Sequence, residues 1–287
     1  MQAQVRIERY ADQGRCVGHI DGRVVFVRFA LPGELVRIEL DEPYDRDDRF
    51  WTGEVVEVIE ASPDRVEPVW PLAGPLAQGG GVGGADLVHV SLPGQLAWKS
   101  TVITDQMHRM GHVECDPVPV ERADGDAELG GLNWRTRIEM IADEAGMPSM
   151  RRRGSHMRVP IDTMPLASRA LLAVANGEHV WDGGFEPGSQ TRLSVPEPRG
   201  IDTTHADSRA LLKAVGNNYA VLVNGELRSG SKHLRESVTV AGGTFDYRVD
   251  ANGFWQVHRM APVMLASHVM DLVRKALDGH KQAVLWD

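Results

Sequence analysis

The first 60 residues alternate short β-rich runs with glycine-containing turns, and this alternation restricts the fold more than any other feature of the chain. Turn sequences such as DQGR, DG and LPGE separate the runs. About five short strands in so short a segment are typical of a small barrel. Four of the runs are VRIERY (5–10), RVVFVRFA (23–30), ELVRIEL (34–40) and WTGEVVEVIE (51–60).

Arginines are frequent along this predicted barrel. A basic barrel face can contact the backbone of single-stranded nucleic acid, but the same residues also suit an ordinary solvated surface, and the sequence favours neither interpretation. The arginines are Arg6, Arg9, Arg15, Arg23, Arg28 and Arg37.

The rest of the chain mixes helical and β-rich segments, and a length of 287 residues suggests two or three domains. Apolar periodicity and glycine stop signals predict helices at 92–111, 165–177, 207–216 and 259–279. The first has an apolar stripe of Leu96, Val102, Ile103, Met107 and Met110. The last has a predicted buried stripe of Val263, Ala266, Met270, Val273 and Leu277. Strands are expected at 133–143, 219–225 and 282–287, and as a pair within 236–258.

Composition limits the compartment and the partners. No apolar run approaches the roughly 18 residues that span a bilayer, and the N-terminus lacks an apolar leader. The two cysteines, Cys16 and Cys115, are too few for a disulfide framework, so we expect a cytoplasmic protein. The net charge of −9 argues weakly against nucleic acid as a partner, although local patches decide binding.

Arginine is in local excess between residues 134 and 158, and this basic run counters the argument against a nucleic-acid partner that the acidic net charge suggests. Guanidinium groups bind phosphates and stack on splayed bases, so this run predicts RNA binding, with a solvated face as the alternative. The predicted RNA-binding residues are Arg135, Arg151, Arg152 and Arg153, with Lys99 and Arg109 as weaker candidates. The segment RRRGSH lies between predicted strands and is a candidate hairpin tip. Stacking would rely on few aromatic residues, such as Phe26, Trp134 and Phe254.

Gly79, Gly81 and Gly84 have the spacing of a dinucleotide-binding loop. That loop requires a strand before it and a helix directly after it, and neither is predicted here. No Lys-Ser/Thr pair directly follows the glycines, so a Walker A loop is also excluded. A surface loop is the simpler interpretation.

The whole chain resembles the TRAM-containing RNA (uracil-5)-methyltransferases. The segment from DQGRCVGHIDGRVVFV to LPGELVRIEL looks like the TRAM barrel, SLPGQLAWKS like the helix after the cluster loop, and NWRTRIEM and RRRGSHMRVPIDTMPLA like the central domain. NGFWQVH looks like the segment that enters the catalytic domain, and AVLWD like its first strand.

The resemblance implies a multidomain α+β chain. An OB-like barrel would occupy 1–60, and a central α/β RNA-binding domain 61–92 and 117–249. The helix, linker and first strand of a Rossmann-like methyltransferase domain would occupy 93–116 and 250–287. The sequence leaves the oligomeric state open, with a monomer favoured.

Many members of this family hold an iron–sulfur cluster on four cysteines. The matching positions here are Trp70, Val82, Ala85 and Met164, none of which supplies a thiolate. We therefore expect no cluster and no other metal, and interpret the glycines as the backbone of a former cluster loop. Apolar packing would replace the cluster, through Trp70, Leu72, Leu76 and Leu87. Cys16 and Cys115 are expected to be structural.

The family's reaction implies S-adenosylmethionine as cofactor. A cysteine thiolate adds to carbon 6 of uracil, carbon 5 attacks the methyl group, and a carboxylate removes the carbon-5 proton. Gln256 matches a cofactor-binding residue, although a surface glutamine is the alternative, and the family's asparagine two positions later is His258 here.

The catalytic cysteine and base have no match in this sequence. We therefore expect these 287 residues to be an inactive N-terminal portion with an incomplete cofactor site. The alternative function is a non-catalytic RNA-binding protein built from a barrel and an α/β module.

Overall fold

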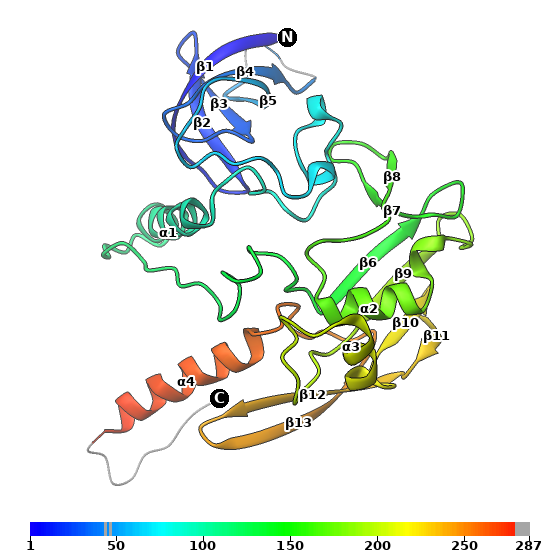
Figure 1. Cartoon of the computed structure of the whole chain (residues 1–287). Coiled ribbons are helices and arrows are strands. Elements are labelled where there is room, and N and C mark those ends of the chain that lie inside the picture. Colours follow the sequence, from blue (N-terminus) through cyan, green and yellow to red (C-terminus); the bar gives the residue numbers. More distant parts are fainter. Residues whose placement is uncertain (43–44, 46–47, 279–287) are drawn as a thin grey trace. The chain divides into compact units, whose positions relative to one another are not determined.

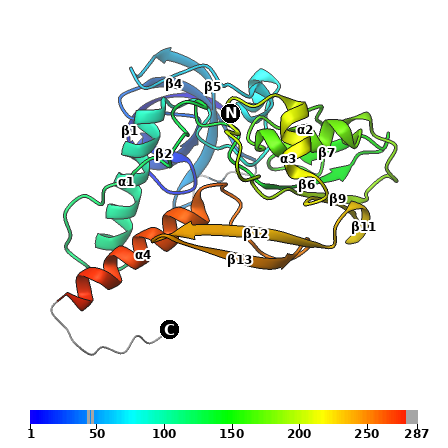
Figure 2. The same ribbon diagram turned by 60° about the horizontal axis from the view of Figure 1, so that its bottom comes forward.

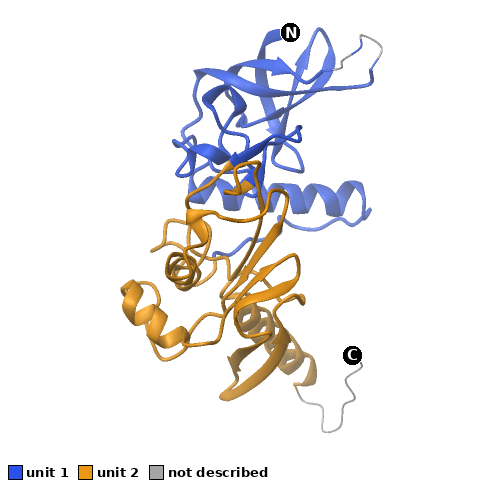
Figure 3. Cartoon of the chain, turned by 90° about the vertical axis from the view of Figure 1, so that its right-hand side faces the viewer, with its two compact units in different colours: residues 1–122, 150–159 blue, residues 123–149, 160–287 orange. Residues whose placement is uncertain are grey.

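A computed structural model describes residues 1–42, 45 and 48–278. The strand predicted at 282–287, and with it the predicted start of a Rossmann-like sheet, lies outside the described residues. Contacts divide the chain into two compact units, coloured in Figure 3. Unit 1 contains residues 1–122 and 150–159, and unit 2 contains residues 123–149 and 160–287.

Unit 1 begins with a closed five-stranded barrel in the order β1-β2-β3-β5-β4, which confirms the predicted barrel (Figure 1). Its core comes from alternate residues, as in β1, where Val5 and Ile7 are buried between exposed neighbours. β3 and β5 pair in parallel, and the other barrel strands pair antiparallel. The strands are β1 (Gln2–Tyr10), β2 (Arg15–Ile20), β3 (Arg23–Arg28), β4 (Leu35–Leu40) and β5 (Trp51–Glu60).

A buried carboxylate joins the barrel to the segment that follows it. Glu34 is fully buried and accepts hydrogen bonds from Arg65 at 2.6 and 2.7 Å, from the Leu31 amide at 2.8 Å and from the Ser62 amide at 3.1 Å. A charge can be buried at modest cost only when it is paired and hydrogen-bonded in this way. The LPGE turn is therefore fixed to residues 62–65.

The same unit continues through two short 3-10 helices, η1 (Pro71–Ala73) and η2 (Leu76–Gln78), to helix α1 (Leu92–Arg109). The Ser91 side chain caps α1 by accepting a hydrogen bond from the Gly94 amide at 3.1 Å. The helix packs through buried Trp98, whose indole donates to the Ala11 carbonyl at 3.1 Å. The predicted apolar stripe is only partly covered, since Leu96 and Val102 are half-buried whereas Ile103, Met107 and Met110 are exposed.

Unit 2 is built on an antiparallel sheet in the order β11-β10-β9-β6-β7-β8, of which β7 and β8 run across the division between the units. Helices α2 (Arg169–Gly177) and α3 (Ser208–Val215) pack against each other, and α2 also contacts β9. A third 3-10 helix, η3 (Val180–Asp182), follows α2. The strands are β6 (Arg137–Ala142), β7 (Pro148–Arg151), β8 (Arg158–Pro160), β9 (Gln190–Ser194), β10 (Ala220–Val223) and β11 (Glu226–Gly230). The helices and strands predicted for residues 133–225 are thus present, with shifted ends.

A long hairpin and a helix complete unit 2, and Figure 2 shows the helix beside the hairpin. Strands β12 (His233–Val240) and β13 (Gly243–Asp250) form the predicted pair, joined by Ala241 and Gly242, which both have positive φ angles. Two such residues allow the tight turn that matches strand twist. Helix α4 (Ala261–Leu277) follows and contacts β12.

The predicted burial of the α4 stripe is wrong. No residue of α4 is buried, and Met270 and Leu277 are 37% and 41% exposed. The stripe is present, but no element among the described residues covers the second half of the helix. Amphipathic spacing shows that a face is suited to burial, and it does not say what covers that face.

Candidate functional site

The glycine-rich loop at 79–84 uses its own backbone groups and presents few of them to a ligand. The amides of residues 79, 80, 81 and 82 donate to the carbonyls of residues 76, 75, 74 and 72 at 2.8–3.0 Å. Gly80 is required by close packing, because a Cβ atom there would lie 2.3 Å from the Gly74 carbonyl oxygen. A phosphate-binding loop needs free N–H groups, so these contacts argue against phosphate binding.

The positions that match cluster ligands are occupied by packing residues. Trp70 and Val82 are 4% and 1% exposed in unit 1, where Ala85 is half-buried, and Met164 is 3% exposed in unit 2. Among the residues that the structure describes, no group of three or more His, Cys, Asp or Glu is arranged to hold a metal. The absence of a cluster remains a prediction. Of the residues expected to pack in its place, Leu72 and Leu87 are half-buried and Leu76 is exposed.

Cys16 is not placed as a nucleophile. Cys16 is buried in the barrel, and its thiol donates to the Ala30 carbonyl at 3.2 Å. Burial raises the pKa of the Cys16 thiol, which opposes formation of the thiolate. Cys115 lies 3.8 Å from His108 Nε2 and is half-buried.

The segment RRRGSH is a hairpin tip between β7 and β8, as predicted, and its three arginines differ in their surroundings. Arg151 is exposed, and Arg152 is half-buried. Arg153 is held within unit 1, where its guanidinium lies 4.6 Å from the Phe29 ring centroid and donates to the Gly74 carbonyl at 3.2 Å. Burial lowers the pKa of Arg153, while nearby Glu54 raises it. Arg153 thus joins the tip to the barrel, and Arg151 is the member of this set most accessible to a ligand.

Arg135, the fourth predicted RNA-binding residue, belongs to unit 2, so the basic run divides between the units. Its guanidinium lies 5.2 Å from the Trp134 ring centroid, and burial lowers its pKa. Trp134 also stacks on His258, with centroids 5.5 Å apart and planes 16° from parallel. Trp134 is therefore enclosed by protein groups, which limits its use as a platform for a base.

Gln256 lies on a segment that is fixed to the central sheet. The Val257 carbonyl accepts from the Thr136 amide at 2.8 Å, and the Arg259 amide donates to the Trp134 carbonyl at 2.8 Å. Gln256 itself is exposed. The backbone that carries the Gln256 side chain is therefore fixed by the hydrogen bonds of the residues that follow it, Val257 and Arg259.

A cluster of charges supports this segment. Asp126 is 3.0 Å from His258 Nε2 and 3.1 Å from the Arg259 guanidinium. The Met260 amide donates to His258 Nδ1 at 3.2 Å, so Nε2 carries the proton and donates to Asp126. Burial raises the pKa of nearby Glu197, while Arg259 and His258 lower it. Sequence reasoning missed Asp126, because nothing local indicates a partner 132 positions away.

Comparisons with known proteins agree with this architecture. Residues 3–58 match the TRAM domain family model. The chain is 71% identical to an uncharacterized RNA methyltransferase of Bifidobacterium longum, over all of this chain and 64% of that protein. It is 32% identical to an uncharacterized RNA methyltransferase of Streptomyces avermitilis, over 93% of this chain and 63% of that one.

Relatives with a more specific name match a smaller part of the chain. The 23S rRNA (uracil(1939)-C(5))-methyltransferase RlmD of Methylococcus capsulatus is 43% identical over 38% of this chain and 22% of that protein. The protein of the same name in Halomonas elongata is 36% identical over 58% of this chain and 33% of that protein. The chain therefore spans less than two thirds of the length of the relatives it matches.

None of its described helices has the length and apolar character needed to cross a membrane.

Proposed function

Because the chain belongs to the TRAM-domain RNA (uracil-5)-methyltransferase family, we propose that the whole protein methylates carbon 5 of a uridine in ribosomal or transfer RNA. The methyl donor is S-adenosylmethionine. Within this proposal, each unit contacts the RNA, and unit 2 presents one side of the cofactor site through Gln256.

The observation that carries the proposal is the placement of Gln256, exposed on a segment whose backbone is bonded to the central sheet through Val257 and Arg259. A glutamine amide both donates and accepts hydrogen bonds, and the methionine end of the cofactor carries an ammonium and a carboxylate. The residue therefore fits that end of the cofactor, which when bound supplies the methyl group. The Asp126, His258 and Arg259 contacts hold Gln256 in position.

On the RNA side, Arg151 is exposed and offers a phosphate contact. Phe254, only two residues before Gln256, is 84% exposed and offers a stacking surface for a base near the cofactor. A base must leave its stack to react, which costs a few kcal/mol, and stacking on Phe254 offsets part of that cost. Arg153 has a positioning role, because its guanidinium is already occupied by Phe29 and Gly74.

The direct test follows the hydrogen on carbon 5, which methylation replaces. The full-length gene product is incubated with S-adenosylmethionine and unmodified RNA that carries tritium at carbon 5 of uridine. We expect tritium release that requires the cofactor, and no release from RNA labelled at carbon 6. A methyl transfer without loss of the carbon-5 label would contradict the proposal.

The Gln256→Ala variant tests the assigned residue. We expect it to need a higher cofactor concentration for half-maximal tritium release, and Asn252→Ala, an exposed neighbour outside the segment, to behave as wild type. Equal cofactor requirements in the Gln256→Ala and wild-type proteins would remove Gln256 from the cofactor site.

A further inference from the structure

Buried and exposed side chains alternate along strand β12 of the β12–β13 hairpin. Leu234, Glu236 and Val238 point inward and are 1%, 7% and 5% exposed. Because side chains alternate along a strand, the residues between them share the opposite face with their partners on β13. This outer face contains the register pairs His233–Asp250, Arg235–Arg248, Ser237–Asp246 and Thr239–Thr244.

Arg235 and Arg248 form the type of pair in which side chains lie closest. The Arg235 amide and carbonyl bond to the Asn218 side chain, at 2.8 and 2.9 Å, so they do not bond to β13. Arg235 and Arg248 are therefore a non-hydrogen-bonded pair, in which Cα atoms approach to about 4.5 Å. Like charges placed directly opposite each other destabilise a hairpin unless an anion lies between them.

No carboxylate among the described residues neutralises these two guanidiniums. Among residues 1–42, 45 and 48–278, neither side chain has a hydrogen bond or an ion pair. The nearest acidic side chains on the same face are otherwise bonded. Asp246 pairs with Arg199 at 2.9 Å, and Asp250 accepts from the Asn252 amide at 2.8 Å.

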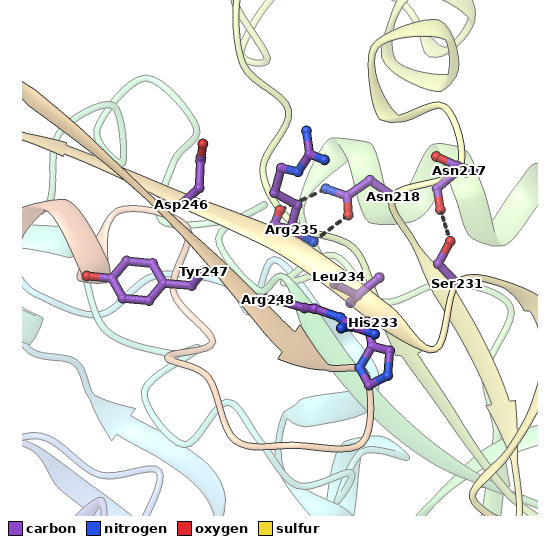
Figure 4. Close-up of a pocket in the computed structure, with 9 residues that line it drawn as sticks. All are labelled: Asn217, Asn218, Ser231, His233, Leu234, Arg235, Asp246, Tyr247 and Arg248. Carbon is purple, nitrogen blue, oxygen red and sulfur yellow. Dashed lines mark hydrogen bonds between the residues drawn. The ribbon is translucent and has the colours of Figure 1, made fainter.

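The surroundings of the pair form an open, polar hollow, shown in Figure 4. Its rim is fixed, because Asn218 bonds to Arg235 and the Ser231 hydroxyl donates to the Asn217 carbonyl at 2.8 Å. The side-chain amide of Asn217 and the His233 imidazole line the same hollow, and neither group is hydrogen-bonded to a described residue. Two guanidiniums with neutral donors beside them suit a phosphodiester, whose oxygens accept several hydrogen bonds.

We propose that Arg235 and Arg248 together bind a phosphate of the RNA backbone, which gives the protein an RNA contact on the hairpin of unit 2 in addition to Arg151. This inference rests on the proposed function, because that function supplies the RNA. The contact positions the RNA and reads no sequence, since phosphate carries no base information.

The test measures binding of a fluorescein-labelled single-stranded oligoribonucleotide by anisotropy over a series of KCl concentrations. Arg235→Gln and Arg248→Gln are each compared with Arg209→Gln, an exposed arginine of α3 that loses the same charge. We expect each hairpin variant to bind about tenfold more weakly. The slope of log affinity against log salt should fall by about 0.7 for the lost phosphate. The Arg209→Gln protein should match wild type.

A second variant separates binding from folding. Arg235→Glu places opposite charges across the pair, so it should raise the thermal midpoint and weaken RNA binding at the same time. A lower midpoint with weaker binding would indicate damage to the hairpin and overturn the inference.

The outcomes distinguish this inference from the proposed function. If wild type binds RNA with a steep salt dependence and the hairpin variants match it, the phosphate site is wrong and the proposed function stands. If wild type binds no RNA, both fail. If the variants lose affinity for polyglutamate as strongly as for RNA, the pair is a general anion site and the inference also fails.

Discussion

At the scale of single residues, Arg153 is bound by the protein through both its charge and its planar face. It donates to the Gly74 carbonyl and lies over Phe29, and its side chain is 17% exposed. We predict that Arg153→Gln lowers the free energy of unfolding by about 2 kcal/mol, from one charged hydrogen bond and one cation–π contact. Urea unfolding followed by tryptophan fluorescence measures this.

The matched control is the exposed Arg151 on the same hairpin tip. Arg151→Gln should change stability by less than about 0.5 kcal/mol, the usual range for surface substitutions. Similar losses in both variants would show that the contacts of Arg153 do not stabilise unit 1.

Glu197 gives a prediction about pH. Burial raises its pKa, so the folded protein holds this proton at pH values where the unfolded chain has lost it. The contribution of Glu197 to stability is therefore present below the ordinary value of about 4.5 and is lost as pH rises through the raised pKa. The variant Glu197→Gln should thus be more stable than wild type at pH 7, and the difference should shrink as the pH falls toward 4.5.

Thermal unfolding of both proteins across this pH range checks the sign. The control is Glu186→Gln, an exposed glutamate of the same unit, for which we expect no such trend. A Glu197→Gln advantage that grows on acidification would contradict the assignment of burial as the dominant effect.

At the scale of elements, the glycine-rich loop is ordered by close backbone packing. A Cβ atom at Gly80 would meet the Gly74 carbonyl oxygen, whereas one at Gly83 would meet nothing within 4 Å. We predict that Gly80→Ala destabilises unit 1 by about 2 kcal/mol, because backbone atoms must shift, and that Gly83→Ala has little effect. Thermal unfolding compares the two, and equal midpoints would refute the packing role.

Asp126 holds the Gln256 segment in place through its ion pairs with His258 and Arg259. Removing its carboxylate in Asp126→Ala leaves Arg259, whose side chain is 7% exposed, without its ion pair. We expect faster hydrogen exchange at the Arg259 and Thr136 amides, which bond the segment to the sheet. Asp202→Ala removes an exposed Asp–His pair and serves as the control. Unchanged exchange in Asp126→Ala would show that backbone bonds alone fix the segment.

At the scale of the whole molecule, local patterns predicted the elements better than their environments. Alternation and glycine turns predicted the barrel, and apolar periodicity with glycine stop signals predicted α1 and α3, because these signals act within a few residues. The burial of α4 was predicted wrongly, since that depends on elements distant in sequence. Arg153 and Phe29 could not be paired from sequence for the same reason. The Asp126–His258 contact likewise has no local signal.

The proposed activity of the gene product is the formation of 5-methyluridine in RNA. Nucleoside mass spectrometry of ribosomal and transfer RNA, from the source organism with and without the gene, tests it most directly. We expect 5-methyluridine to disappear from one defined position when the gene is disrupted and to return when it is restored. Unchanged 5-methyluridine in every RNA fraction, with or without the gene, would contradict it.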